Sequence, residues 1–205
     1  MGTIISLWVK LAYTLFVIVL VPVYWLEHGH ENFLWGSDIA LFVTVLALWA
    51  ENALLASMMA LAILVPELAW NIDFFWRLMF GADSLQLLGT RYMFDPDLPL
   101  LVRGLSLFHV ALPALLVWLI YRLGYERRAL IYQTVLAWVV LPASYLLTDP
   151  AANINWVRGL GREPQAWMPA PVYLILLMIA FPLVVYLPTH LLLERLFAAP
   201  RSSRC

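Results

Sequence analysis

A histidine, two carboxylates and two serines are the side chains of this sequence best suited to proton-transfer chemistry. His109 lies about ten residues into an apolar stretch, where an imidazole is suited to act as a general base. A nucleophilic hydroxyl could come from Ser37 or Ser106. A carboxylate that orients the imidazole could come from Asp38 or Glu67. These residue types predict the nucleophile, base and orienting acid of a hydrolase or acyltransferase, against the alternative of a structural histidine bonded to a neighbouring helix.

Six further polar or aromatic residues are candidates for contacts with a substrate. Asn71 follows Glu67 by four residues, so the two lie on one face of a helix. Asp149 begins a turn after an apolar stretch, and two amides and an indole follow it. The alternative is that these groups form only structural ion pairs and turns. The candidates are Asn71, Arg103, Asp149, Asn153, Asn155 and Trp156.

We expect no cofactor and no metal from this sequence. His28 and His30 flank a glycine and could ligate a metal with an adjacent glutamate, but two loop histidines form a weak pattern. His109 and His190 lie at different depths of their apolar stretches, which does not fit a pair of haem ligands. Cys205 is the only cysteine, so the sequence offers no disulfide within the chain, no cysteine-based zinc site and no buried cysteine nucleophile.

The composition places these residues in a membrane protein. Of the 205 residues, 64% are apolar and only 12% are charged, and the mean hydropathy is +0.86. Soluble domains average about 45–50% apolar and about 25% charged residues. The composition therefore excludes a disordered chain and a disulfide-built secreted scaffold. The net charge of −1 also leaves no basic face for a nucleic acid. The expected partners are membrane lipids and a lipid-like substrate, and the oligomeric state stays open.

The apolar stretches predict six transmembrane helices in one all-α bundle. Each stretch approaches the roughly 20 residues that a helix needs to cross a bilayer. They are too long for the strands of a β-barrel, which would alternate over about ten residues. Polar turns separate them, and we expect a single integral membrane domain over residues 1–205. The predicted spans are 4–26, 36–50, 53–76, 98–121, 129–147 and 171–193.

The loop charges predict an orientation, and the orientation gathers the polar residues. Seven basic residues fall on the side of the two termini and five on the other side, which favours cytoplasmic termini in a bacterial inner membrane. Nearly all the costly polar side chains of the membrane-spanning segments then fall in the outer half of the membrane, where ionisable groups need a partner or water. Asp73 and Arg77 are one helical turn apart and should form an ion pair. The pattern predicts a polar pocket that opens to the outer side, against the alternative of structural ion pairs at helix ends.

Three segments carry a resemblance to known families. They are residues 32–40 (NFLWGSDIA), 103–109 (RGLSLFH) and 149–156 (DPAANINW). They resemble uncharacterised bacterial six-helix membrane proteins and, more distantly, the androgen-induced family of intramembrane hydrolases. That family is a six-helix bundle that hydrolyses fatty-acid esters of hydroxy fatty acids. The resemblance implies that His109 is its helix-four base and that Asp38 matches the polar residue after its threonine nucleophile. Trp35 lies near the position of that threonine, and Ser37 is the nearest hydroxyl.

The sequence leads to one functional hypothesis and two alternatives. The first is a membrane-embedded lipid-processing enzyme of the hydrolase or acyl-transfer type. The second is a non-catalytic protein that binds or transports a lipid or a small solute through the same pocket. The third is a structural membrane subunit, which requires only the ion pairs.

Overall fold

The structure is a computed structural model that describes residues 3–82, 84, 89–161 and 164–197. Within these residues, five helices are long and apolar enough to cross a membrane, and a sixth apolar helix is shorter. The protein is therefore an integral membrane protein with an all-α bundle, which confirms the predicted fold class. The long helices are α1 (Leu7–His28), α3 (Ala53–Phe80), α4 with α5 (Leu100–Leu123), α6 (Ala129–Leu147) and α7 to α8 (Ala170–Phe197); the short one is α2 (Gly36–Ala50).

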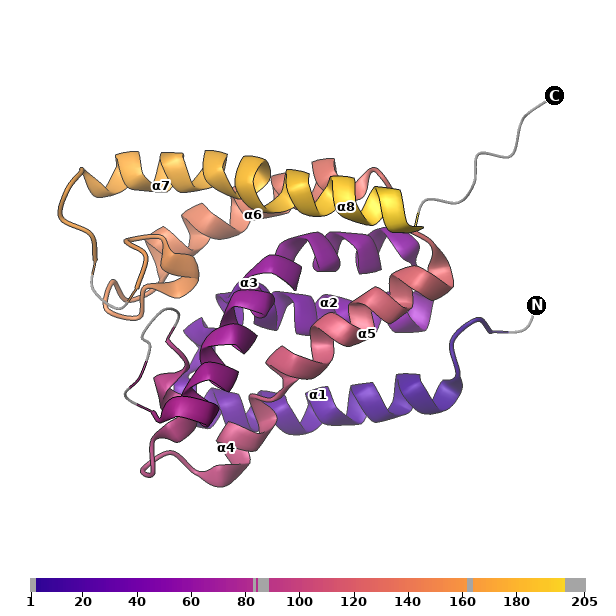
Figure 1. Cartoon of the computed structure of the whole chain (residues 1–205), viewed down its shortest axis with the longest axis horizontal. Coiled ribbons are helices and arrows are strands. Elements are labelled where there is room, and N and C mark those ends of the chain that lie inside the picture. Colours follow the sequence, from indigo (N-terminus) through magenta and orange to yellow (C-terminus); the bar gives the residue numbers. More distant parts are fainter. Residues whose placement is uncertain (1–2, 83, 85–88, 162–163, 198–205) are drawn as a thin grey trace.

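Helix α3 lies at the centre of the bundle. It packs against α2, α5 and α6, and it also meets the last helical rod. That rod consists of α7 (Ala170–Ala180), the π-helix η4 (Phe181–Tyr186) and α8 (Leu187–Phe197), and it runs along one edge of the bundle (Figure 1). Because α3 touches most of its neighbours, side chains along its length can meet groups from nearly every other helix.

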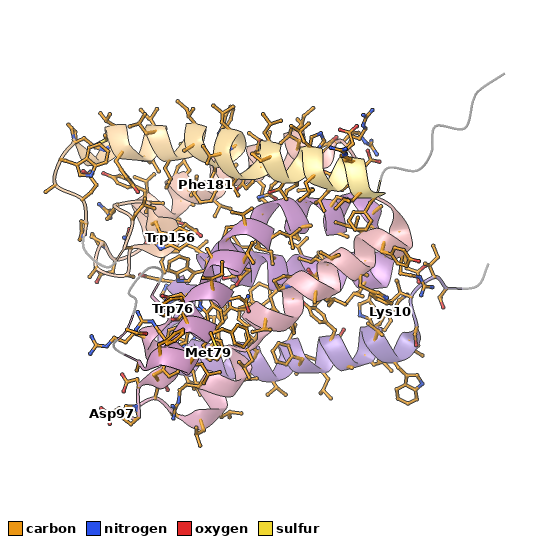
Figure 2. The ribbon with its side chains drawn as sticks, viewed as in Figure 1. Lys10, Trp76, Met79, Asp97, Trp156 and Phe181 are labelled. Atoms are coloured by element: carbon orange, nitrogen blue, oxygen red, sulfur yellow. The ribbon has the colours of Figure 1, made fainter. Side chains whose placement is uncertain are left out.

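The two ends of the bundle carry different segments of the chain. One end carries the α2–α3 turn and Lys10, together with the start of α1 and the end of α8 (Figures 1 and 2). The other end carries the long connections between α3 and α4 and between α6 and α7. Three short helices lie in the connections at this loop end: η1 (His30–Leu34), η2 (Thr90–Phe94) and η3 (Ile154–Trp156).

Helix α2 is too short to cross a bilayer alone. Its 15 residues span roughly 22 Å, against about 30 Å for the hydrocarbon core. Glu51 ends it in a left-handed conformation with φ 48°, and Asn52 then caps α3 by accepting a hydrogen bond from the Leu55 N–H at 3.0 Å. The helix therefore forms a tight hairpin with α3 and leaves the loop end of its span to be completed by η1.

The fourth span corrects the sequence analysis, which treated it as one continuous helix. It breaks into α4 (Leu100–Leu105) and α5 (Phe108–Leu123), with a tighter turn at Ser106 and Leu107. The N–H of His109 bonds to the carbonyl of Ser106, three residues earlier, at 3.2 Å. A regular helix would use the residue four earlier. Arg103, Ser106 and His109 therefore do not fan over one regular helical face.

The buried pair of Asp73 and Arg77 confirms the prediction for helix α3. Arg77 Nε donates to Asp73 Oδ2 at 3.3 Å, and both side chains are almost completely buried. The same carboxylate oxygen accepts hydrogen bonds from the backbone N–H and the hydroxyl of Thr90, at 3.2 and 2.6 Å. The pair therefore anchors η2 to α3 at the loop end.

Glu51 organises the opposite end. Its carboxylate accepts hydrogen bonds from the N–H groups of Ile4 and Ile5 and from Lys10 Nζ, at 2.9, 3.1 and 2.8 Å. The hydrogen bond from Lys10, followed by the two backbone hydrogen bonds, lowers the pKa of Glu51 to about 2. This carboxylate therefore ties the start of α1 to the α2–α3 turn.

The Glu51 contacts predict a pH-dependent stability. Because the folded pKa lies below the ordinary value of about 4.5, the stabilisation is complete above that value and is lost as the pH falls from about 4.5 through about 2. We expect the difference in unfolding temperature between wild type and Glu51→Gln, measured in detergent, to be constant near neutral pH and to shrink across this acidic window. A difference that persists at the acidic limit would contradict a contribution from the charge.

Candidate functional site

A cavity of about 800 Å³ opens among the helices at the loop end and extends into the bundle. It is lined by residues of α1, α2, α3, α5, α6 and η4 and by the short helices of the connections. Eight of the residues predicted from the sequence line it: Ser37, Asp38, Glu67, Ser106, His109, Asn153, Asn155 and Trp156. Asn71, Arg103 and Asp149 do not.

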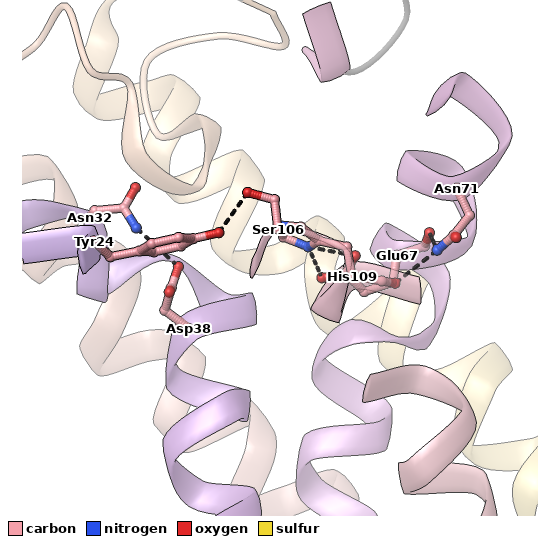
Figure 3. Close-up of polar contacts among 7 residues, drawn as sticks. All are labelled: Tyr24, Asn32, Asp38, Glu67, Asn71, Ser106 and His109. Atoms are coloured by element: carbon pink, nitrogen blue, oxygen red, sulfur yellow. Dashed lines mark hydrogen bonds and ion pairs between the residues drawn. The ribbon is translucent and has the colours of Figure 1, made fainter. Parts of the chain in front are cut away.

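His109 and Glu67 form a polar pair on the cavity wall. His109 Nδ1 lies 2.9 Å from each oxygen of the Glu67 carboxylate (Figure 3). An ionised carboxylate can only accept, so it selects the tautomer of a neutral imidazole that carries its proton on Nδ1 and a lone pair on Nε2. Nε2 has no hydrogen-bond partner among the described residues, and His109 lines the cavity. An imidazole held in this tautomer has the basic nitrogen that a general base requires.

Aromatic rings fix the plane of the imidazole. The ring of Trp70 stacks on it with 4.6 Å between the centroids, and that of Phe108 stacks at 4.1 Å. The His109 side chain is only 14% exposed. Because the Glu67 carboxylate holds one edge of the ring and aromatic rings stack against it, the imidazole has little freedom to rotate.

Asn71 supports His109 through the backbone. Pro113 has no N–H, so it cannot donate to the carbonyl of His109 four residues earlier. Asn71 Nδ2 donates to that carbonyl at 2.8 Å and also to the carbonyl of Glu67 at 2.7 Å. Asn71 was expected to contact a substrate; instead it satisfies a backbone group that lipid could not satisfy.

Neither predicted nucleophile is hydrogen-bonded to the histidine. Ser106 donates to the carbonyl of Val102 at 3.0 Å, and its Oγ lies 2.6 Å from the hydroxyl of Tyr24. Ser37 lines the cavity, but it makes no hydrogen bond to His109 in the described part of the chain. Ser106 uses its single proton on the backbone, so the geometry does not activate it as a nucleophile.

Asp38 does not orient the imidazole, because Glu67 does. The Asp38 side chain lies at the start of α2, is 3% exposed and lines the cavity. Its Oδ2 accepts a hydrogen bond from Asn32 Nδ2 at 3.3 Å, and its Oδ1 has no partner among the described residues (Figure 3). The carboxylate thus belongs to the cavity wall, is buried and is incompletely satisfied.

Asn153 and Asn155 line the cavity, but their amides hold the protein together. Asn153 donates to the carbonyls of Gly159 and Gly161, both at 2.9 Å. Asn155 donates to the Leu34 carbonyl and to Ser144 Oγ and accepts from the N–H of Gly36, at 2.7, 2.9 and 2.8 Å. This one amide joins the connection after α6 to η1 and to the start of α2.

Trp156, Arg103 and Asp149 take three different positions. Trp156 has a left-handed backbone with φ 56°, and its ring meets the Trp35 ring edge-on at 5.8 Å on the cavity wall. Arg103 Nη1 lies 3.5 Å from the Met93 carbonyl, away from the cavity. Asp149 is exposed and accepts from the N–H of Ala151 at 2.8 Å, as a turn residue does.

The deep part of the cavity is apolar. Its walls come from α3, α6 and η4, and the residues there include Met59, Ala62, Ile63, Leu136, Ala137, Val140 and Phe181. Gln133 and Tyr186 close it, with the amide nitrogen 3.5 Å from the phenol oxygen. The Asn155 side chain is hydrogen-bonded to both Ser144 and Gly36, so these two residues lie at the same height along the bundle axis, next to the loop-end wall. Gln133 is eleven residues before Ser144 on α6. The cavity therefore extends roughly 16 Å below its loop-end wall.

Sequence reasoning missed the aromatic residues of the polar end. Tyr24, Trp35, Trp70 and Tyr92 all line the cavity. Burial raises the pKa of the Tyr92 phenol, and the charges of Glu67 and Asp38 raise it further, so Tyr92 stays protonated. In a chain with 10 tryptophans and 9 tyrosines, no spacing separates these rings from those that face lipid.

The described residues hold no group of three or more histidine, cysteine or acidic side chains that could bind a metal ion. The rings of His28 and His30 pack on Tyr24 and Trp25 with centroid distances of 5.1 and 6.0 Å. Comparisons of the chain with protein-family models, with curated proteins and with solved structures find no match.

The Asn155 contacts predict a structural role that its place on the cavity wall does not suggest. Asn155→Ala removes three hydrogen bonds and places alanine at φ 55°, so it should lower the free energy of unfolding by at least about 2 kcal/mol. Asp149→Ala, in the same connection, should lower it by less than about 1 kcal/mol. Reversible unfolding in mixed micelles measures both. Equal stability of Asn155→Ala and wild type would contradict this structural role of Asn155.

Proposed function

We propose that this protein is a membrane-embedded lipid-processing enzyme of the hydrolase or acyl-transfer type. The observation that supports it best is the Glu67–His109 pair on the wall of the cavity, in which the carboxylate holds Nδ1 and no described residue is bonded to Nε2. A positioned general base of this kind contributes about 10²–10⁴-fold to the rate of a proton transfer.

The reaction that fits this geometry uses a nucleophile from outside the chain. Because no serine of the described residues is bonded to His109, the nucleophile is water, or a lipid hydroxyl in the case of transfer. Its oxygen bonds to the ester carbonyl carbon while its proton passes to Nε2, and the ester C–O bond then breaks. The leaving alcohol takes the proton back from Nε2. Glu67 stabilises the transient imidazolium, and the protonated Tyr92 can donate to the developing oxyanion.

The substrate class follows from the shape of the cavity. The polar end, with His109 and Glu67, suits an ester or a headgroup, and the apolar part suits an acyl chain. The membrane supplies such molecules directly. The proposed relationship to the androgen-induced hydrolases is compatible with His109 on the fourth span, although Trp35 and Ser37 stand near the place of that family's threonine.

The alternative is a protein that binds or transports a lipid or a small solute without catalysis. Two observations favour it: neither serine is bonded to His109, and the fourth span and the last rod are interrupted at α4–α5 and η4. Interrupted helices line substrate sites in transporters. A purely structural subunit has no use for a cavity of this size with a free imidazole.

We further propose that the cavity opens to the periplasmic side of a bacterial inner membrane and that both termini are cytoplasmic. The charge bias of seven to five basic residues supports this orientation. Cysteine labelling tests it. In a Cys205→Ser background, Ala152→Cys at the exposed rim of the cavity should react with a membrane-impermeant maleimide in intact cells. Labelling that requires lysed cells would reverse the orientation and leave the cavity unchanged.

His109→Gln separates catalysis from binding. The amide keeps hydrogen-bonding capacity but cannot accept a proton near neutral pH. On 4-nitrophenyl esters with acyl chains from acetyl to palmitoyl, we expect kcat/KM to fall by about 10²–10⁴-fold with little change in unfolding temperature. Glu67→Gln should also lower kcat, because its amide can offer N–H rather than oxygen to Nδ1 and so misorient the base.

His190→Gln is the matched control for this experiment. His190 lies on α8, where its Nδ1 is 2.7 Å from the Tyr125 hydroxyl and outside the cavity. This variant should keep wild-type turnover. The enzyme proposal fails if His109→Gln retains wild-type turnover, or if the wild type converts none of the esters while still binding them; the second result supports the binding protein.

A further inference from the structure

Asp38 is the carboxylate of the cavity that the proposed reaction does not use. Of the carboxylates that line the cavity, Glu67 is paired with His109, whereas Asp38 has only the 3.3 Å hydrogen bond from Asn32. Its Oδ1 is buried and without a partner among the described residues. A buried carboxylate without a compensating charge is costly, and more so at membrane depth. The cavity itself is where a compensating group could bind.

Several aromatic residues line the same cavity as this carboxylate. Tyr24 and Asp38 both line the cavity, and the Tyr24 hydroxyl lies 2.6 Å from Ser106 Oγ (Figure 3). Trp35 begins the helix that carries Asp38, and its ring meets Trp156 on the cavity wall. Tyr92 lines the same cavity. Carboxylates combined with aromatic faces are the groups that proteins use to bind ammonium and quaternary ammonium ions.

The remaining charges of the cavity do not neutralise Asp38. Arg77 is bonded to Asp73 and to the carbonyl of Ala82. Arg91, at the start of η2, is exposed and forms no ion pair within the described chain. Arg91 therefore stays available to a phosphate that accompanies an ammonium group.

We propose that the polar end of the cavity binds the ammonium headgroup of a single-chain or double-chain lipid, with Asp38 as its counter-ion and Tyr24, Trp35 and Tyr92 around it. This inference deepens the proposed function, on whose cavity it rests, by naming the headgroup of the ligand. The acyl chain then occupies the apolar part between α3, α6 and η4. In this position Asp38 selects the ligand and Glu67 with His109 acts on it.

Binding of defined lipids tests the headgroup directly. The probes are lysophosphatidylcholine, lysophosphatidylglycerol and an alkyltrimethylammonium ion, all with the same chain length, added to the full chain in amphipol. Quenching of tryptophan fluorescence reports binding. Wild type should bind both trimethylammonium probes at least about tenfold more tightly than the glycerol headgroup. Asp38→Asn should lose this preference, whereas Asp38→Glu should retain most of it.

The matched control is Asp97→Asn, an exposed aspartate at the loop end (Figure 2) that does not line the cavity. It should bind all probes as wild type does. The inference is overturned if wild type shows no preference, if Asp38→Asn keeps it, or if the alkyltrimethylammonium ion does not bind, since phosphate would then be the recognised group. If Asp38→Asn fails to fold, the wild-type ratio still decides.

The proposed enzymatic activity and the proposed headgroup preference can be rejected independently of each other. None of the binding measurements requires hydrolysis, so an ammonium preference in a protein that converts no ester would support this inference and reject the enzyme. Conversely, an enzyme whose Asp38→Asn variant keeps its headgroup preference would support the proposed function and reject this inference.

Discussion

The position of His109 depends on a hydrogen bond that a proline makes necessary. Pro113 leaves the His109 carbonyl without its helical donor, and a backbone carbonyl in lipid has no water to replace it. Asn71 supplies the donor and thereby fixes α5 against α3 at the level of the base. The same solution recurs on the last rod, where Pro182 leaves the Met178 carbonyl free and Trp138 Nε1 donates to it at 2.9 Å.

The distribution of charged residues follows from the same property of lipid, which offers no water to solvate polar groups. Lys10 forms an ion pair with Glu51 and Arg77 forms one with Asp73, and the Glu67 carboxylate is hydrogen-bonded to His109. Each pair has a structural consequence, because it joins two elements: α1 to the α2–α3 turn, η2 to α3 through Thr90, and α5 to α3. Asp38 breaks this pattern, which makes it the residue whose chemistry points outside the chain.

The sequence predicts the features that depend on composition, such as the apolar helices. It does not predict the features that depend on which groups become hydrogen-bond partners in the folded chain. Hydropathy located all six apolar helices because burial in lipid requires long apolar runs, and the cost of charge predicted that polar groups would gather at one end. It also identified His109 and Glu67. It did not predict that Asn71 and Asn155 would bind backbone groups, because an amide suits a substrate and a carbonyl equally well. Nor did it predict the break at Ser106, which the local residues alone do not require.

The shortness of α2 explains why the cavity lies where it does. Since α2 covers only about 22 Å of its span, irregular backbone must complete the crossing, and such backbone survives at membrane depth only inside protein or beside a polar cavity. Here η1 and the connection around η3 fill that space, and Asn155 joins both to Gly36. Their polar groups, together with Asp38 at the start of α2, form the loop-end wall of the cavity. The feature that makes this helix a weak transmembrane span is therefore also what gives the bundle a polar interior.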